Sequence, residues 1–218
     1  DVIDVQGIHD ARRGVRGWIA AGLESQLVAA YEDNTDTGPF QADGTAIARR
    51  RLRNTCLGLL METGAQSHVD RAHAQFKAGA NMTDVSAALQ SLAATDCPER
   101  QIALKAFEIE WRDEPLGMDK WFAIQATSPL AGTLNHVVEL MDHDCFDLKN
   151  PNRVRSLLGA FFMMNPAQFH AADGSGYRFF GRQLLALDQF NPQVAARMMS
   201  EIIRWRRFDP DRRAMMKT

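Results

Sequence analysis

The chain has 218 residues, of which 45% are hydrophobic and 24% charged, and its net charge is −2. This composition is that of a soluble globular protein, and the small net charge argues against nucleic acid or an anionic membrane as the main partner. The length allows one large domain or two small ones. No apolar run is long enough to span a bilayer, and no signal peptide opens the chain. The first residue is Asp rather than Met, so we expect a piece of a longer protein or a processed product.

The three cysteines, Cys56, Cys97 and Cys145, lie far apart and form no Cys-x-x-Cys pair. An odd number of separated cysteines argues against a disulfide framework and favours a reducing compartment. We therefore expect a cytoplasmic protein.

Apolar residues at helical spacing begin early in the chain. The first apolar stripe comprises Val15, Ile19, Leu23, Leu27 and Ala30. A polar break that contains Gly and Pro begins at Asn34. A second helix, with Asp43 or Thr45 as its N-cap, has a stripe of Ala48, Leu52, Cys56, Leu59 and Leu60. We expect Arg49, Arg50 and Arg53 to lie outside that stripe, and Gly64 to be the left-handed residue that ends the helix.

The middle of the chain continues this pattern. Asn81 and Asp84 approximate a capping box at the start of a third helix. A fourth helix begins at Cys97-Pro98, and its expected apolar face comprises Ile102, Ala103, Ala106, Phe107 and Trp111. Its expected solvent face comprises Lys105, Glu108 and Arg112. Further helices are predicted over 116–126, 130–141, 151–163, 176–188, 192–207 and 210–217.

Four helix starts in the last third of the chain share one form. They are Asn150-Pro151, Asn165-Pro166, Asn191-Pro192 and Asp209-Pro210. Proline suits the first helical position because it has no N–H to leave unpaired, and the preceding Asn or Asp can cap the turn. Closely spaced starts indicate short stacked helices, and period-2 strand patterns are missing. The sequence therefore predicts an all-α fold, an irregular right-handed α-α superhelix of stacked hairpins that resembles ARM and HEAT solenoids. Its curved inner face would bind or cover something.

A search for catalytic motifs finds no self-sufficient active site. The zinc-peptidase motif His-Glu-x-x-His is missing, and His68 and His73 diverge on a helix. His136, Glu139 and His143 share a helical face and could hold a cation, but a polar face near a helix end is the preferred interpretation. The segment from Asp173 to Tyr177, Asp-Gly-Ser-Gly-Tyr, has neither a P-loop ending nor a Gly-x-Ser-x-Gly motif. We interpret it as a loop before a capped helix.

Several long segments carry a family resemblance. They are "PLGMDKWFAIQATSP" (Pro115–Pro129), "NPNRVRSLLGAFFMMNPAQFHAADGSGYRFF" (Asn150–Phe180), "NPQVAARM" (Asn191–Met198) and "RWRRFDPDRR" (Arg204–Arg213). These segments resemble the C-terminal helical domain of the bacterial aminopeptidase N family. The members of that family are zinc-dependent M1 metallopeptidases. The similarity covers nearly the whole chain.

The resemblance implies that residues 1–218 form a single C-terminal helical domain of a larger enzyme, which releases N-terminal amino acids from peptides. That family binds zinc in an upstream catalytic domain, through His-Glu-x-x-His and a distant Glu. This chain would then hold no metal and no catalytic residue, and would be inactive alone. Its partners would be the upstream domain of the same polypeptide, whose active-site cavity it encloses, and the peptide substrate.

The resemblance also implies three substrate-facing residues. Arg155 matches a basic residue that lines the family's cavity, and Gln193 and Arg197 match a second group that faces the peptide. Guanidinium groups suit this role because they bind carbonyl and carboxylate oxygens well. We expect Arg155 and Arg197 to lie near helix starts, where free N–H groups add positive potential. The alternative for each arginine is a surface salt bridge.

Two other functions stay open on the residues alone. One is a stand-alone helical-repeat adaptor that binds a partner protein in its groove. The other is an RNA-binding repeat that uses the arginine clusters at 49–51 and 204–207, although such clusters are more often solvated helix faces.

Overall fold

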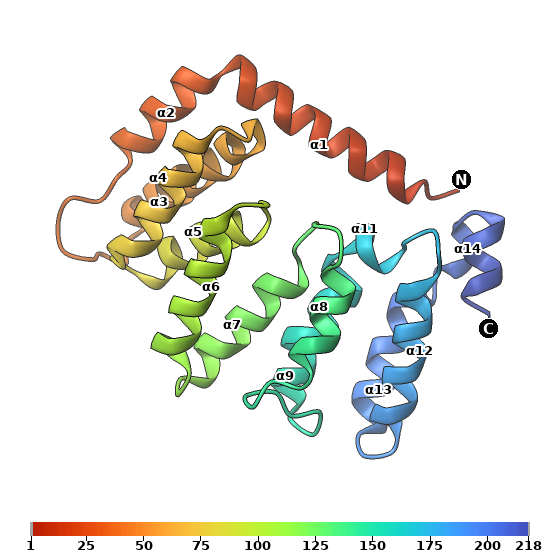
Figure 1. Ribbon diagram of the computed structural model, residues 1–218. Coiled ribbons are helices and arrows are strands. Elements are labelled where there is room, and N and C mark those ends of the chain that lie inside the picture. Colours follow the sequence, from red (N-terminus) through yellow and green to blue (C-terminus); the bar gives the residue numbers. More distant parts are fainter. Residues whose placement is uncertain (1, 218) are drawn as a thin grey trace. The chain divides into compact units, whose positions relative to one another are not determined.

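The structure, a computed structural model, describes residues 2–217, with the side chain of Glu201 left out. The chain forms two compact units. One comprises Asp10–Glu110, and the other joins the chain up to His9 to everything from Trp111 onward. Figure 1 follows the helices of both in chain order. Within the described residues no helix combines the length and the apolar character needed to cross a bilayer.

The helices of the Asp10–Glu110 unit pack as hairpins. They are α1 (Val5–Gly22), which begins in the other unit, α2 (Glu24–Asp33), α3 (Gly44–Leu60), a short 3-10 turn η1 (Met61–Thr63), α4 (Gln66–Ala78), α5 (Met82–Ala93) and α6 (Pro98–Trp111), whose last residue belongs to the other unit. Helix α2 packs on α3, α4 packs on α5, and α3 also packs on α5. The fully buried side chains at their centre include Leu57, Leu60, Leu89, Leu92 and Phe107.

The second unit is built of shorter helices. They are α7 (Pro115–Ala126), α8 (Thr133–Leu140), α9 (Pro151–Val154), the π-helical turn η2 (Arg155–Gly159), α10 (Ala160–Met164), α11 (Pro166–Phe169), α12 (Ser175–Asp188), α13 (Pro192–Met198), the 3-10 turns η3 (Met199–Ile202) and η4 (Trp205–Arg207), and α14 (Pro210–Met215). The helix predicted over 192–207 is therefore interrupted after Ile202. The one extended pairing among residues 2–217 is an isolated bridge between Ile3 and Phe208.

Phenylalanine rings fill the centre of this second unit. Phe161, Phe162, Phe169, Phe179 and Phe180 pack edge-to-face or tilted, with ring centroids 4.9–6.4 Å apart. Such rings are favoured in offset and edge-on pairs because the ring edge is electropositive and the face electronegative. The cluster joins α10, α11 and α12. A side chain at Gly176 would meet the carbonyl oxygen of Phe169 at 2.1 Å, so only glycine lets α12 approach α11 this closely.

All four predicted Asn-Pro and Asp-Pro helix starts are confirmed. The side chains of Asn150, Asn165, Asn191 and Asp209 each accept a backbone N–H of the first helical turn. Asn165 does more than cap α11, because its buried amide also donates to the carbonyl oxygens of Ala126 and Ser128 at 2.9 and 2.7 Å. This cap therefore also joins the end of α7 to α11.

The solvent face predicted for α3 is wrong at two positions. Arg50 and Arg53 are buried, whereas Leu52 of the predicted stripe is exposed. Arg50 donates to Asp36 and to the carbonyl oxygen of Gln41, and so holds the loop between α2 and α3. The expected left-handed conformation of Gly64 is confirmed, with φ of 72°. The prediction from charge alone was wrong because each guanidinium is paired with a carboxylate, Arg50 with Asp36 and Arg53 with Asp84.

The face predicted for α6 is also partly wrong, although the helix itself is confirmed. Ile102 is 57% exposed, whereas Glu108 is buried and accepts a hydrogen bond from Lys105 at 2.8 Å. Ala103 and Phe107 are buried as predicted. The buried face of α6 therefore includes Glu108 and excludes Ile102.

The first predicted stripe does not form one buried face. The helix breaks at Leu23, between α1 and α2, and Val15, Ile19 and Leu23 are all exposed. Helix α1 contacts its own unit through its other side, where Ala20 is fully buried. The periodicity is that of an amphipathic helix, but these three apolar side chains are exposed in the described part of the chain.

Candidate functional site

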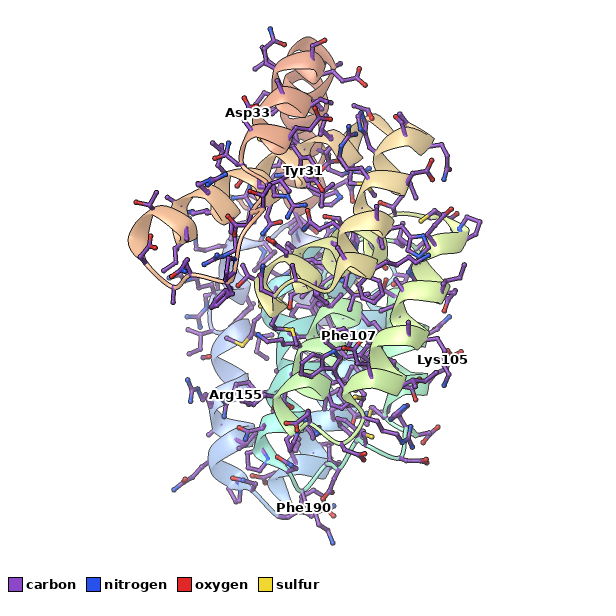
Figure 2. The ribbon with its side chains drawn as sticks, turned by 90° about the vertical axis from the view of Figure 1, so that its left-hand side faces the viewer. Tyr31, Asp33, Lys105, Phe107, Arg155 and Phe190 are labelled. Atoms are coloured by element: carbon purple, nitrogen blue, oxygen red, sulfur yellow. The ribbon has the colours of Figure 1, made fainter. Side chains whose placement is uncertain are left out.

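The two arginines of the Asn150–Arg155 segment have different surroundings. Arg153 is buried, donates to the carbonyl oxygens of Cys145 and Pro115 at 2.8 Å each, and forms an ion pair with Asp119. Arg155 is exposed, and its Nη2 donates to the side chain of Asn152 at 3.1 Å. Arg153 is therefore a structural anchor, whereas the side chain of Arg155, labelled in Figure 2, is exposed.

The helix that carries Arg155 is irregular. Arg155 is the first residue of the π-helical turn Arg155–Gly159, which lies between α9 and α10 and packs on α7. A π-turn widens the helix by one residue, and such turns occur frequently at functional sites. The sequence predicts one continuous helix here, because a π-turn has no simple residue signature.

Gln193 and Arg197 are exposed and lie four residues apart on α13, on the same side of the helix. Helix α13 packs on α12 through its buried Ala195 and Met198. The expectation that Arg197 lies near a helix start is wrong, because α13 ends one residue later and Arg197 belongs to its last turn. There the partial charge of the helix end is negative and stabilises a cation. Among the described residues no hydrogen bond joins Arg155 to Gln193 or Arg197.

His136 and His143, which the sequence suggested as cation ligands, already make hydrogen bonds to other groups of the chain. His136 contacts Gln125 through Nε2 at 2.8 Å and Glu139 through Nδ1 at 3.3 Å. His143 Nδ1 accepts the backbone N–H of Cys145. Within residues 2–217 no three His, Cys, Asp or Glu side chains gather closely enough to hold a metal ion.

The Asp173–Tyr177 segment is a turn that leads into α12 at Ser175, as predicted, but the expected side-chain cap is wrong because the N-cap residue is Gly174. Asp173 Oδ1 accepts both the backbone N–H and the hydroxyl of Ser175, and these bonds lower the pKa of its carboxyl group. Gly174 takes the left-handed conformation, with φ of 70°. The segment therefore orients the start of α12.

A half-buried histidine, His170, connects α11 to residues near the C-terminal end of the unit. His170 Nδ1 contacts the hydroxyl of Tyr177 at 2.8 Å, and its ring stacks on Phe208. The carbonyl oxygen of His170 accepts from Arg212, which also pairs with Asp209. Burial, with a smaller contribution from the Arg212 charge, lowers the pKa of His170 from 6.5 to about 4.

We expect protonation of His170 to destabilise the folded protein as the pH falls. Because its folded pKa of about 4 lies below its unfolded value of 6.5, its full stabilisation is present above pH 6.5 and is lost between pH 6.5 and 4. The loss amounts to about 3 kcal/mol over that range. Urea unfolding at a series of pH values measures it, with His170→Asn as the control in which this part of the pH dependence disappears. Equal pH dependence in both proteins would contradict the prediction.

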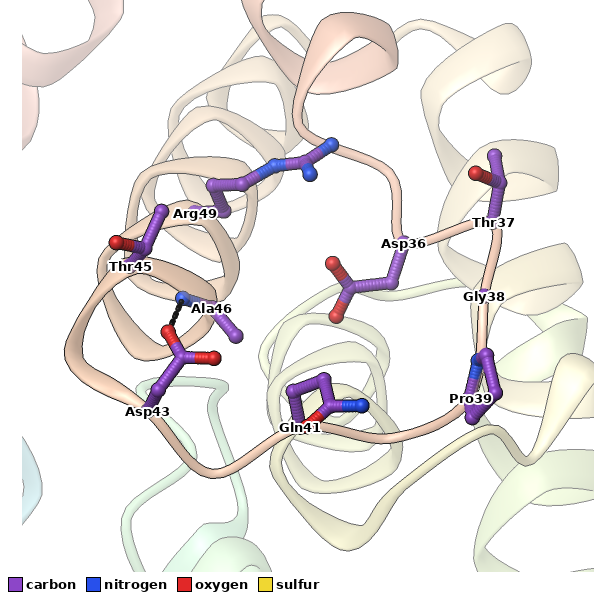
Figure 3. A pocket seen from close by; sticks show the side chains of 9 residues that line it. All are labelled: Asp36, Thr37, Gly38, Pro39, Gln41, Asp43, Thr45, Ala46 and Arg49. Carbon is purple, nitrogen blue, oxygen red and sulfur yellow. Dashed lines mark hydrogen bonds between the residues drawn. The ribbon is translucent and has the colours of Figure 1, made fainter.

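The pocket in Figure 3 has a volume of about 290 Å³ and lies at the loop before α3. It is lined by Asp36, Thr37, Gly38, Pro39, Gln41, Asp43, Thr45, Ala46 and Arg49. Its carboxylates have structural partners, since Asp36 pairs with Arg50 and Asp43 caps α3 through the N–H of Ala46. None of the three residues expected to bind substrate lies in this pocket.

Comparisons with known proteins agree over the whole chain. A family profile described as "Domain of unknown function (DUF3458_C) ARM repeats" matches residues 1–218. Aminopeptidase N of Escherichia coli is 40% identical over 217 residues, which are 100% of this chain and 25% of that protein. Aminopeptidase N of Caulobacter vibrioides is 36% identical over 217 residues, with the same coverage. A crystal structure of Legionella pneumophila aminopeptidase A in complex with aspartic acid superposes with a TM-score of 0.89 and 29% identity, over 99% of this chain and 26% of that one.

Two conclusions follow from these matches. The chain spans about a quarter of the length of the curated relatives, at their C-terminal end. ARM repeats are stacked helical hairpins, so the predicted all-α solenoid class is confirmed.

Proposed function

Because the chain belongs to the family of DUF3458_C ARM-repeat domains, we propose that it is the non-catalytic C-terminal domain of a zinc-dependent aminopeptidase, which releases N-terminal amino acids from peptides. The observation that carries this proposal is the 36–40% identity over essentially the whole chain with proteins named aminopeptidase N. Residues 1–218 act as one domain that encloses the active-site cavity of the upstream catalytic domain. The free thiols of Cys56, Cys97 and Cys145 support a reducing, cytoplasmic compartment.

In such an enzyme a zinc ion, held outside this chain, supplies an activated water for hydrolysis of the first peptide bond. The residues of this chain act on the part of the peptide beyond that bond. Arg155 and Arg197 bind its main-chain carbonyls and its C-terminal carboxylate, for which the planar guanidinium offers paired donors. Gln193, one turn before Arg197, offers both a donor and an acceptor. Support comes from the exposure of all three side chains and from the π-turn at Arg155.

Kinetics of the full-length enzyme test these roles. With Arg155→Ala or Arg197→Ala, kcat/KM for a tetrapeptide should fall about tenfold or more, because a hydrogen bond to a charged group is lost. An aminoacyl p-nitroanilide does not extend to these residues, so its kcat/KM should change less than about twofold.

Arg182→Ala is the matched control, since Arg182 is an exposed arginine on α12 that the proposal does not use. It should leave both substrates unaffected. Equal losses on the peptide and the anilide, or no loss on the peptide, would show that Arg155 and Arg197 do not contact the substrate. Failure of the enzyme to release any amino-terminal residue would reject the proposed function itself.

A further inference from the structure

Helix α1 contacts its own unit through polar side chains. Arg16 donates to Glu62 at 2.6 Å and to the carbonyl oxygen of Gly58 at 2.8 Å, and Arg13 also pairs with Glu62. Arg13, Arg16 and Ala20 are spaced by three and four residues, so they lie on one side of the helix. This side faces α3 and the turn after it.

The other side of α1 is apolar and uncovered. It comprises Ala11, Val15, Trp18 and Ile19, which recur at i, i+4, i+7 and i+8 and are here called the α1 apolar face. Trp18 is 79% exposed, Val15 50% and Ile19 39%. An amphipathic helix is normally attached by its apolar side, whereas α1 is attached by its charged side. A solvent-exposed tryptophan within an apolar stripe marks a contact surface.

We propose that the α1 apolar face packs against the helical hairpin that immediately precedes this segment in the parent polypeptide. The inference rests on the proposed function, which makes the chain part of a longer protein. Relatives carry about three quarters of their length outside the matched region. In ARM-type arrays each repeat buries its apolar face on the next, and terminal repeats have a polar outer face. Helix α1 has no such polar face, so it is an internal element of the array.

We expect a helix on the α1 apolar face because this face has the residue spacing that a neighbouring helix packs against. Its apolar residues span two turns with spacings of four and three, which matches the ridges and grooves of helix packing. Within the same unit α2 packs on α3 and α4 packs on α5. The preceding hairpin continues that arrangement by one repeat of about 40 residues.

Photo-crosslinking in the full-length parent protein tests the proposal. The substitution Trp18→p-benzoylphenylalanine places a reactive aromatic ketone on the α1 apolar face, and Val15→p-benzoylphenylalanine repeats the test if the first variant does not fold. After irradiation and digestion, mass spectrometry should find the crosslinked peptide within about 50 residues before Asp1, the length of one repeat. Arg13→p-benzoylphenylalanine is the control on the opposite side of α1. Its crosslink should fall near Gly58–Glu62.

Each other outcome overturns the proposal. A crosslink between two molecules would make the α1 apolar face a dimer contact. A crosslink far upstream would assign it to another domain, and one within residues 111–218 would assign it to this chain. No crosslink at Trp18 or Val15, with a normal one at Arg13, would leave the face solvated. Aminopeptidase activity of the same preparation is measured separately, so the loss of the proposed function and the loss of this contact are distinguishable.

Discussion

Replacement of Arg153 by methionine is expected to lower the free energy of unfolding by about 3–5 kcal/mol, the usual cost of removing one partner of a buried ion pair. Arg153 is buried, and its guanidinium bonds Asp119 and the carbonyl oxygens of Pro115 and Cys145. Methionine would fill much of the volume but would leave these oxygens without their donor. The loop between α8 and α9 would then lose its attachment to α7.

The control is the neighbouring arginine of the same helix. Arg155 is exposed, and among the described contacts its side chain bonds only Asn152. Arg155→Met should therefore change the free energy of unfolding by less than about 0.5 kcal/mol. Urea unfolding followed by circular dichroism measures both variants under the same conditions. Similar stabilities of the two variants would show that Arg153 is not the anchor that its contacts indicate.

These two arginines also show how far the sequence predicts the candidate site. Both occur in Asn-Pro-Asn-Arg-Val-Arg, and a sequence pattern cannot tell which side chain is buried. The difference depends on Asp119 and on the carbonyl of Pro115, which are more than 30 residues away. Arg155 is exposed and begins the π-turn, and no local residue preference predicts that turn. Arg197 was placed near a helix start because the end of α13 at Met198 was not foreseen.

Local signals predicted the helix boundaries much better than the buried faces. The Asn-Pro and Asp-Pro starts, the cap at Asn81 and the left-handed Gly64 depend on neighbouring residues alone, and all are confirmed. Burial depends on partners from elsewhere in the chain. Arg50 and Glu108 are buried because Asp36 and Lys105 pair with them, and hydrophobic periodicity carries no information on such partners. The first apolar stripe failed for a different reason, since the chain breaks at Leu23 and Val15, Ile19 and Leu23 are exposed in the described residues.

Removal of the Asp84 carboxylate is expected to destabilise the Asp10–Glu110 unit by about 3–5 kcal/mol. Asp84 is buried and accepts hydrogen bonds from Arg53 at 3.0 Å, Asn54 at 2.8 Å and Asn81 at 3.0 Å. Arg53 is itself buried and also donates to the hydroxyl of Tyr31. In Asp84→Ala the guanidinium of Arg53 stays buried without a carboxylate, and this uncompensated charge dominates the loss.

The double variant tests whether that charge is the cause. If it is, Arg53→Met in the Asp84→Ala background should recover part of the lost stability, because two apolar side chains replace an unpaired buried ion. Asp70→Ala is the surface control, since Asp70 is exposed and bonds only Gln66 among the described contacts. It should cost less than about 0.5 kcal/mol. Thermal and urea unfolding of the parent protein, Asp84→Ala, Arg53→Met and the double variant complete the cycle. Strictly additive losses in the double variant would mean that Asp84 acts through its bonds to Asn54 and Asn81 instead, and that Arg53 is stabilised by Tyr31 alone.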